Sequence, residues 1–121
     1  MKLVDSNILI YAAREEFSYL REMISDSSNY YSVISIVEVL GFPGLSSVDR
    51  QFFEAVFNVL TPVPIHAEII NMAVGVRSLK KISLGDSIIA ATARVHGLEI
   101  LTRNVSDFSW LAGIKVSNPI Q

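Results

Sequence analysis

Four of the twelve acidic residues have surroundings that an exposed helix face would not give them. Asp5 directly follows the apolar residues 3–4, and Glu38 lies inside the apolar run 33–40. Asp86 lies among the apolar and small residues of segment 82–91, and Asp107 lies in a polar turn that follows the apolar residues 100–101. A carboxylate that is buried alone takes up a proton, so it stays charged only beside a cation or several hydrogen-bond donors. These four residues are therefore candidates for a cation-binding site.

The elements that must position these acids are predicted by the pattern of apolar residues. Strands are expected at residues 2–4, 30–32, 99–102 and 114–116, with a proline-rich edge strand or link at 61–64. Helices are expected at 8–14, 17–24, 33–40, 47–60, 66–81 and 84–96, with Asn7, Ser46 or Ser47, and Ser83 as N-caps and Gly97 as the C-terminal stop. Alternating strands and helices predict an α/β fold, a three-layer α/β/α sandwich with a short central parallel sheet. At 121 residues, the chain 1–121 is expected to be a single domain.

In a parallel sheet, Asp5 and Asp107 fall at the same edge, because both follow strands. Asp86, in the first turn of its helix, and Glu38, within a helix, can lean over that edge. Four converging carboxylates repel one another, and a hard divalent cation removes the conflict. Because the chain has no cysteine and no histidine at ligand spacing, Mg²⁺ or Mn²⁺ is the expected metal.

A carboxylate-bound Mg²⁺ favours phosphate oxygens as its remaining ligands, so the expected chemistry is phosphodiester hydrolysis by a metal-activated water. Asp107 or Glu38 is the candidate to orient or deprotonate that water. No serine–histidine or cysteine nucleophile competes with this mechanism. His66 and His96 fall at predicted helix ends, where an imidazole has a structural role.

Each acid also has a structural explanation of its own. Asp86 could complete a capping box opened by Ser83. Asp5 and Asp107 could accept hydrogen bonds within turns, as Asx residues often do. Glu38 could form an ion pair with Arg77 or Arg94.

The overall charge does not indicate a nucleic-acid binder, because the net charge is −2 and the pI is about 5.6. Any RNA contact must come from local basic residues, and the candidates are Arg14, Arg94 and Arg103, together with the group Arg77, Lys80 and Lys81. For that group, the favoured interpretation is a helix end that complements its dipole. No segment has the features of a signal peptide or a membrane span, so a cytoplasmic protein with no membrane contact is expected.

The ordered set of motifs resembles the PIN domain ribonucleases, and among them the VapC-type toxins of toxin–antitoxin pairs. Residues 4–11, VDSNILIY, are similar to the first-strand aspartate motif of that family, and residues 34–39 are similar to its helix-borne glutamate. Residues 84–93 and 101–108 are similar to its third and last acidic motifs. The resemblance spans the whole chain in the family's order.

The resemblance implies a Mg²⁺- or Mn²⁺-dependent endoribonuclease whose metal site and catalytic residues are Asp5, Glu38, Asp86 and Asp107. It assigns supporting roles to Ser6, Thr102 and Asn104, and it implies an RNA substrate, a cognate antitoxin and a homodimer. Two alternatives remain. One is a PIN-like module that binds RNA or protein without catalysis. The other is a haloacid-dehalogenase-type phosphatase, which is disfavoured because Asn7 stands where that chemistry needs a second aspartate.

Overall fold

A five-stranded parallel sheet forms the centre of the computed structural model, which describes residues 1–121. The strands are β1 Lys2–Val4, β2 Tyr30–Ser32, β3 Thr61–Val63, β4 Glu99–Leu101 and β5 Val116–Ser117, in the order β3-β2-β1-β4-β5. All four pairings are parallel. The proline-containing β3 lies at an edge, as its Pro62 predicts, because proline cannot donate a hydrogen bond to a second neighbour.

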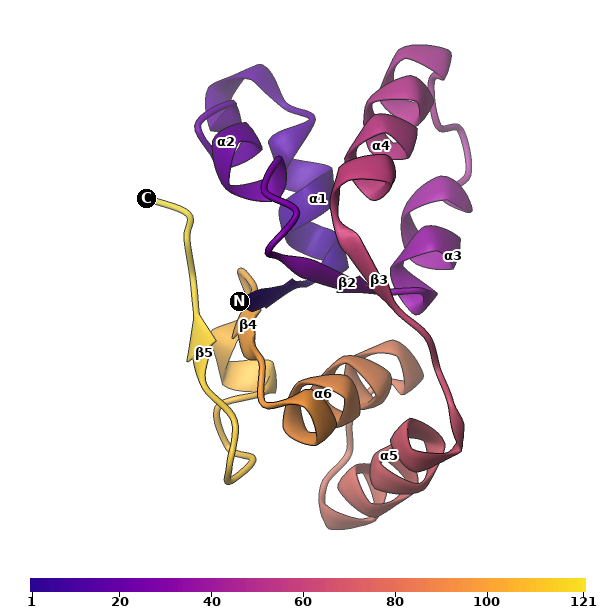
Figure 1. The fold of residues 1–121 in the computed structure, drawn as a ribbon, viewed down its shortest axis with the longest axis vertical. Helices are drawn as coiled ribbons and strands as arrows, with labels where there is room; N and C mark the ends of the chain where they lie inside the picture. The colour runs from indigo at the N-terminus through magenta and orange to yellow at the C-terminus, as the bar shows by residue number, and fades with distance from the viewer.

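Helices cover both faces of this sheet, which confirms the three-layer α/β/α sandwich (Figure 1). One face carries α1 Ser6–Ala12, the 3-10 turn η1 Glu15–Phe17, α2 Leu20–Ile24, α3 Ile34–Leu40 and α4 Ser47–Val59. The other face carries α5 Ala67–Leu79 and α6 Leu84–His96. A second 3-10 turn, η2 Val105–Asp107, follows β4. None of these helices combines the length and the apolar character needed to cross a bilayer.

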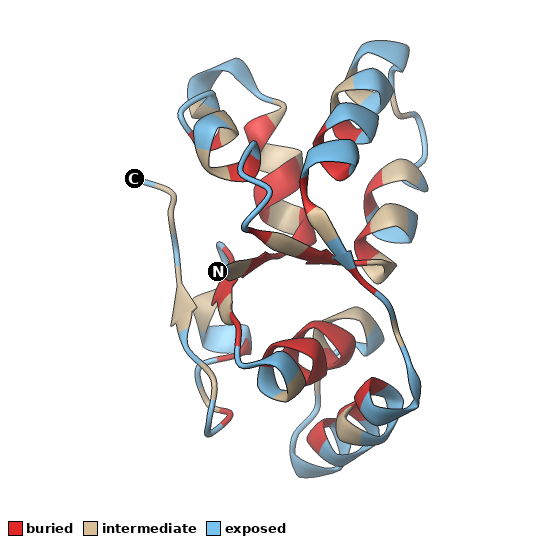
Figure 2. Cartoon of the chain, viewed as in Figure 1, coloured by how far each residue is buried: buried red, intermediate tan, exposed pale blue.

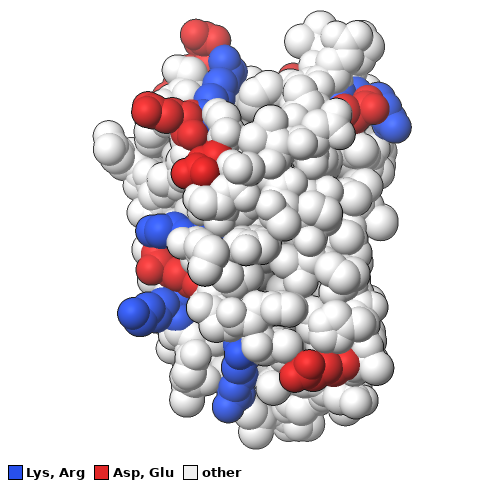
Figure 3. Space-filling view, viewed as in Figure 1, with Lys and Arg blue, Asp and Glu red and all other residues white.

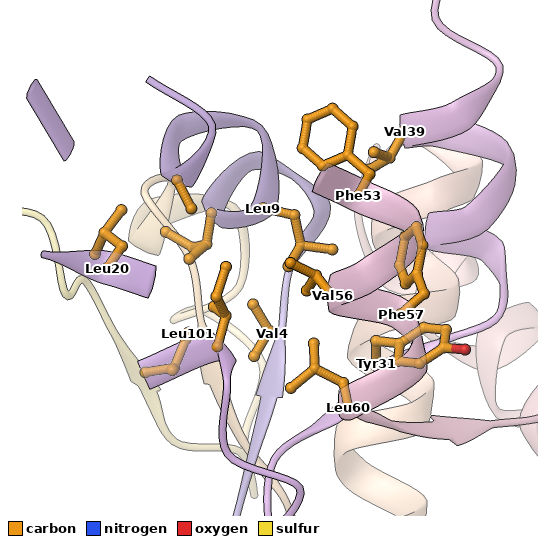
Figure 4. Packing of buried hydrophobic residues seen from close by; sticks show 13 residues of the cluster. Val4, Leu9, Leu20, Tyr31, Val39, Phe53, Val56, Phe57, Leu60 and Leu101 are labelled. Atoms are coloured by element: carbon orange, nitrogen blue, oxygen red, sulfur yellow. The ribbon is translucent and has the colours of Figure 1, made fainter. Parts of the chain in front are cut away.

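Neighbouring residues of the central strands pack into different layers, because successive side chains of a strand point to opposite faces. Val4 and Leu101 join the cluster under α1 and α4, which Figure 4 shows from close by. Leu3 and Ile100 join the cluster under α6. Buried residues therefore line both sides of the sheet (Figure 2), and the paired residues 3–4 of β1 and 100–101 of β4 are apolar, as in strands covered on both faces.

Two helices differ from the expectation. The first helix begins at Ser6 with Asp5 as its N-cap, so Asn7 lies inside the helix and is not the cap. The expected helix 17–24 is divided into η1 and the short α2. Phe17 packs edge-on against Tyr11, with ring centroids 5.0 Å apart, which ties the 3-10 turn to α1 before the chain turns into α2.

Candidate metal centre

Asp5 lies at the carboxyl end of β1, where its carboxyl group binds both the start of α1 and the residue that follows β4. Its Oδ1 accepts a hydrogen bond from the Ser6 N–H (2.8 Å) at the start of α1. Its Oδ2 accepts one from the Thr102 hydroxyl (2.8 Å), just beyond β4. Only 6% of Asp5 is exposed. Burial, followed by the charges of Asp86 and Glu38, raises the pKa of Asp5 to about 6, although its hydrogen bonds with Thr102 and Ser6 oppose the rise.

Thr102 is fully buried and joins the end of β4 to the start of α1. Besides donating to Asp5, its hydroxyl oxygen accepts hydrogen bonds from Asn7 Nδ2 (3.2 Å) and the Asn104 N–H (3.1 Å). Asn7 Oδ1 in turn accepts from the Arg103 N–H (3.2 Å). The expected supporting residue Thr102 therefore contacts the site directly, and Asn104 contributes its backbone. Asn7, expected only as a cap, also belongs to this network.

Glu38 of α3 reaches the same edge of the sheet through Ser6. The Ser6 hydroxyl lies 2.8 Å from both Glu38 Oε1 and Ser35 Oγ. Because it carries a single proton, it accepts from Ser35 when it donates to Glu38. The apolar surroundings of Glu38 in the sequence suggested burial, but Glu38 is exposed, because α3 turns Ser35 and Val39 inward instead.

Glu38 forms no ion pair with Arg77 or Arg94, which was its structural alternative. The three ion pairs in the structure are Lys2–Glu99, Arg21–Glu15 and Arg50–Glu54.

Asp86 lies in the first turn of α6. The Ser83 hydroxyl accepts a hydrogen bond from the Asp86 N–H (3.1 Å), which is the N-cap half of the expected capping box. Burial and then the charge of Asp107 raise the pKa of Asp86, with a further contribution from Glu38, while a hydrogen bond with Ser83 lowers it. A Cβ atom at the neighbouring Gly85 would lie 2.6 Å from Glu38 Oε2, so the start of α6 lies directly against Glu38.

Asp107 ends η2 and is exposed. Its backbone carbonyl accepts a hydrogen bond from the indole N–H of Trp110 (2.8 Å). Asp107 and Asp86 line one pocket of about 190 Å³. This pocket, which we call the lysine–tryptophan pocket, is also lined by Lys80, Lys81, Ile82, Ser83, Ser106 and Trp110.

The pKa shifts connect the four acids electrostatically at this edge of the sheet, with Asp86 coupled to each of the other three. Asp86 acts electrostatically on Asp5, and its own pKa responds to Asp107 and Glu38. No three Asp, Glu or His side chains lie close enough to hold one ion in the observed conformation. The donor atoms are all carboxylate oxygens, the ligands that Mg²⁺ and Mn²⁺ prefer. Glu38 and Asp107 are exposed, and the Ser6 hydroxyl holds the Glu38 carboxylate in its observed position.

The three expected RNA-binding arginines are not all close to these acids. The guanidinium groups of Arg14 and Arg103 lie 4.8 Å and 5.1 Å from the centroid of the Tyr11 ring, beside the Asn7 network. Arg94 lies two turns, about 12 Å, along α6 from Asp86. On the face shown in Figure 3, positive and negative side chains are interspersed, with no continuous basic patch.

Sequence reasoning overlooked several residues at this edge. Ser35 lies three positions before Glu38 on a helix, a spacing that places both on one face. Trp110 carries no motif, and Lys80 was considered only as part of a basic helix end, because a loop and a turn far apart in sequence bring the two together.

Comparison with known proteins gives a consistent result over nearly the whole chain. The PIN domain profile matches residues 2–112. The chain is 30% identical to Ribonuclease VapC1 of Rickettsia felis over 125 aligned positions, which cover 94% of this chain and 92% of that protein.

Solved structures show the same fold. A toxin–antitoxin complex from Klebsiella pneumoniae contains a chain 31% identical, with a TM-score of 0.78 and coverage of 100% of this chain and 99% of that one. The DNA-bound VapBC of Salmonella typhimurium contains a chain 19% identical, with a TM-score of 0.79 and 98% of each chain covered, which supports the fold alone.

Proposed function

This chain belongs to the PIN domain family, and on that premise we propose that it is a Mg²⁺- or Mn²⁺-dependent endoribonuclease, the toxin of a toxin–antitoxin pair. The observation that carries the proposal is the group of four carboxylates at the sheet edge. Burial and the neighbouring charges of Asp86 and Glu38 raise the pKa of Asp5 to about 6. Carboxylates so arranged gain from a dication more than isolated surface acids do.

Asp5, Glu38, Asp86 and Asp107 are the residues that would hold the ion. When bound, a dication of this kind neutralises the acids, polarises a phosphoryl group and lowers the pKa of a bound water. The donor set fits this role, because it consists entirely of carboxylate oxygens.

The other residues of the edge orient the acids and the substrate. Thr102 fixes the rotamer of Asp5, and Ser6 positions the Glu38 carboxylate. Glu38 or Asp107, both exposed, accepts the proton of the attacking water. Arg103, held beside the site through its backbone bond to Asn7, would contact a phosphate of the RNA.

We further propose a cognate antitoxin as the partner. An apolar groove of about 230 Å³ lies between α1, α3 and α4, with Ile10, Val39, Phe42 and Phe53 among its lining residues. Val39 belongs to α3, the helix that also carries Glu38, and we propose that a segment of the antitoxin binds in this groove. We also propose that residues 1–121 act as one domain in a homodimer, and that the protein meets its RNA in the cytoplasm.

The test is cleavage of a mixed RNA pool by the purified protein in EDTA and after addition of Mg²⁺ or Mn²⁺. We expect cleavage only with the metal, and its loss in Asp5→Asn. Glu54→Gln, which makes the same carboxyl-to-amide change on exposed α4, is the matched control and should cleave like the wild type. Equal cleavage by wild type and Asp5→Asn would overturn the proposal.

A non-catalytic RNA-binding module is the second candidate. It is favoured by the observation that no three acidic side chains converge closely enough for one ion. RNA binding without cleavage at saturating Mn²⁺ would identify it.

A further inference from the structure

We propose that the lysine–tryptophan pocket is the subsite for the nucleotide next to the scissile phosphate. In this arrangement Lys80 and Lys81 contact its phosphate and the Trp110 indole stacks on its base. The inference rests on the proposed ribonuclease function. It adds a binding site for one nucleotide between the acids and the C-terminal end of α5.

The position of the pocket is the first support. Asp86 and Asp107, two of the four proposed metal ligands, form part of its wall, and the two lysines form another part. A strand whose scissile phosphate lies at the acids can therefore place its next nucleotide in this pocket.

The charges of the pocket are the second support. Neither Lys80 nor Lys81 belongs to any of the three ion pairs in the structure, although carboxylates line the same pocket. Both ammonium groups remain available to an anion. A phosphate is the anion that a metal-bound RNA strand brings to this place.

Trp110 is the third support, because its ring is held in place. Its N–H donates to the Asp107 carbonyl (2.8 Å), so the indole is fixed relative to the turn that carries the last acid. The Lys80 ammonium lies 5.2 Å from the ring centroid. Sites for single-stranded nucleic acids combine such aromatic platforms with cations. A cation–π contact at an exposed site is weak, so a base can replace the ammonium on the ring.

The structural alternative is that these lysines only complement the dipole of α5, since Lys80 is the C-cap of that helix. That role predicts a change in stability when the lysines are removed, and no change in RNA binding. The two roles can therefore be separated by measurement.

The first experiment uses intrinsic fluorescence, because Trp110 is the only tryptophan in the chain. Titration of the wild-type protein with a short single-stranded RNA, with Ca²⁺ in place of Mn²⁺ to suppress cleavage, should quench the indole emission as the base stacks. Unchanged emission at saturating RNA would contradict stacking on Trp110.

The second experiment measures affinity by fluorescence anisotropy of a labelled RNA at several salt concentrations. Trp110→Ala should weaken binding roughly five- to a hundredfold, and Trp110→Phe, which keeps an aromatic platform, should retain most of the affinity. Removing both lysines should reduce the slope of log affinity against log salt by about 0.7, since the single phosphate that they contact contributes about that much on a single strand. Lys115→Ala, an exposed lysine outside the pocket, is the control and should bind like the wild type.

The outcomes separate this inference from the function on which it rests. If the wild type cleaves RNA while the lysine and tryptophan variants keep its affinity and salt slope, the subsite is wrong and the ribonuclease stands. If the wild type neither binds nor cleaves RNA, both the subsite and the proposed ribonuclease function are wrong. Melting temperatures of all variants identify any loss of binding that comes from unfolding, and Trp110→Phe then decides the stacking.

Discussion

The carboxyl group of Asp5 has two hydrogen-bond partners, one at the start of α1 and one beyond β4. This group caps α1 through Ser6 and also binds Thr102, so it is held in one conformation. The same burial that fixes it disfavours its charge and raises its pKa to about 6. The capping role is therefore observed, and the metal role that we propose falls on the same side chain.

This pKa predicts how stability depends on pH in metal-free buffer. Because the folded-state value of about 6 lies above the ordinary 3.8, the folded state binds the proton more tightly than the unfolded state does. The contribution of Asp5 protonation to the free energy of unfolding is fully present below pH 4 and is lost as the pH rises through 6. A shift of this size corresponds to on the order of 3 kcal/mol of unfolding free energy.

Urea unfolding of wild type and Asp5→Asn at pH 4 and pH 7.5 checks this. From pH 4 to pH 7.5, the unfolding free energy of the wild type should fall by on the order of 3 kcal/mol more than that of the variant. Parallel pH profiles for the two proteins would show that Asp5 titrates normally.

Thr102 predicts a second result at the residue scale. Thr102→Val keeps the shape of the side chain but leaves Asp5 Oδ2, Asn7 Nδ2 and the Asn104 N–H without this partner. We expect a loss of about 1–3 kcal/mol in unfolding free energy. The pKa of Asp5 should also rise above its wild-type value, because the bond that lowers it is gone.

Carboxyl NMR titration and urea unfolding measure both effects. Thr102→Ser, which retains the hydroxyl, should keep the pKa of Asp5 close to that of the wild type. If the pKa of Asp5 is the same in Thr102→Val and Thr102→Ser, the hydroxyl group is not what holds Asp5.

At the scale of elements, the absence of a side chain at Gly85 lets the Glu38 carboxylate of α3 lie against the start of α6. A Cβ at Gly85 would meet the Glu38 carboxylate at 2.6 Å, whereas one at Gly75 in α5 would meet nothing within 4 Å. Both positions are helical, so both changes to alanine are favourable for the helix itself.

The paired substitutions Gly85→Ala and Gly75→Ala therefore separate stability from activity. Gly75→Ala should raise the unfolding free energy by about 1 kcal/mol without changing RNA cleavage. Gly85→Ala should displace Glu38 and lower cleavage by about a hundredfold while the fold remains intact. RNA cleavage rates and urea unfolding provide the measurements, and equal cleavage by the two variants would mean that the position of Glu38 does not matter.

Local signals predicted many of the elements but not their contacts. Ser46 and Ser83 cap α4 and α6 as expected, and Gly97 ends α6 with a φ of 65°. These features depend on neighbouring residues alone. The exposure of Glu38 and its bond to Ser6 depend on how α3 packs against α1, and an apolar run of sequence does not show this.

At the scale of the whole molecule, the parallel topology brings the acids together. Residues that follow β1 and β4 must meet at one edge when these strands pair side by side, so the positions of Asp5 and Asp107 were predictable from the order of elements. The lysine–tryptophan pocket was not, because Lys80 and Trp110 are joined only by tertiary packing.

The surface predicts the state of assembly. Val37, Val48 and Val74 each expose about two-thirds or more of their area, and Phe42, Leu79 and Leu84 are similarly exposed. Some of these side chains would be covered in the homodimer that we propose. We expect light scattering of the purified protein to give twice the chain mass of 13.4 kDa. A mass of one chain at micromolar concentration would contradict the proposed homodimer.

The most direct test of the account is a crystal structure with Mn²⁺, examined by anomalous scattering. The account predicts a peak bounded by carboxylate oxygens of Asp5, Glu38, Asp86 and Asp107, with Glu38 and Asp107 turned inward from their observed positions. A peak at some other place, or none among these four residues at saturating Mn²⁺, would contradict it.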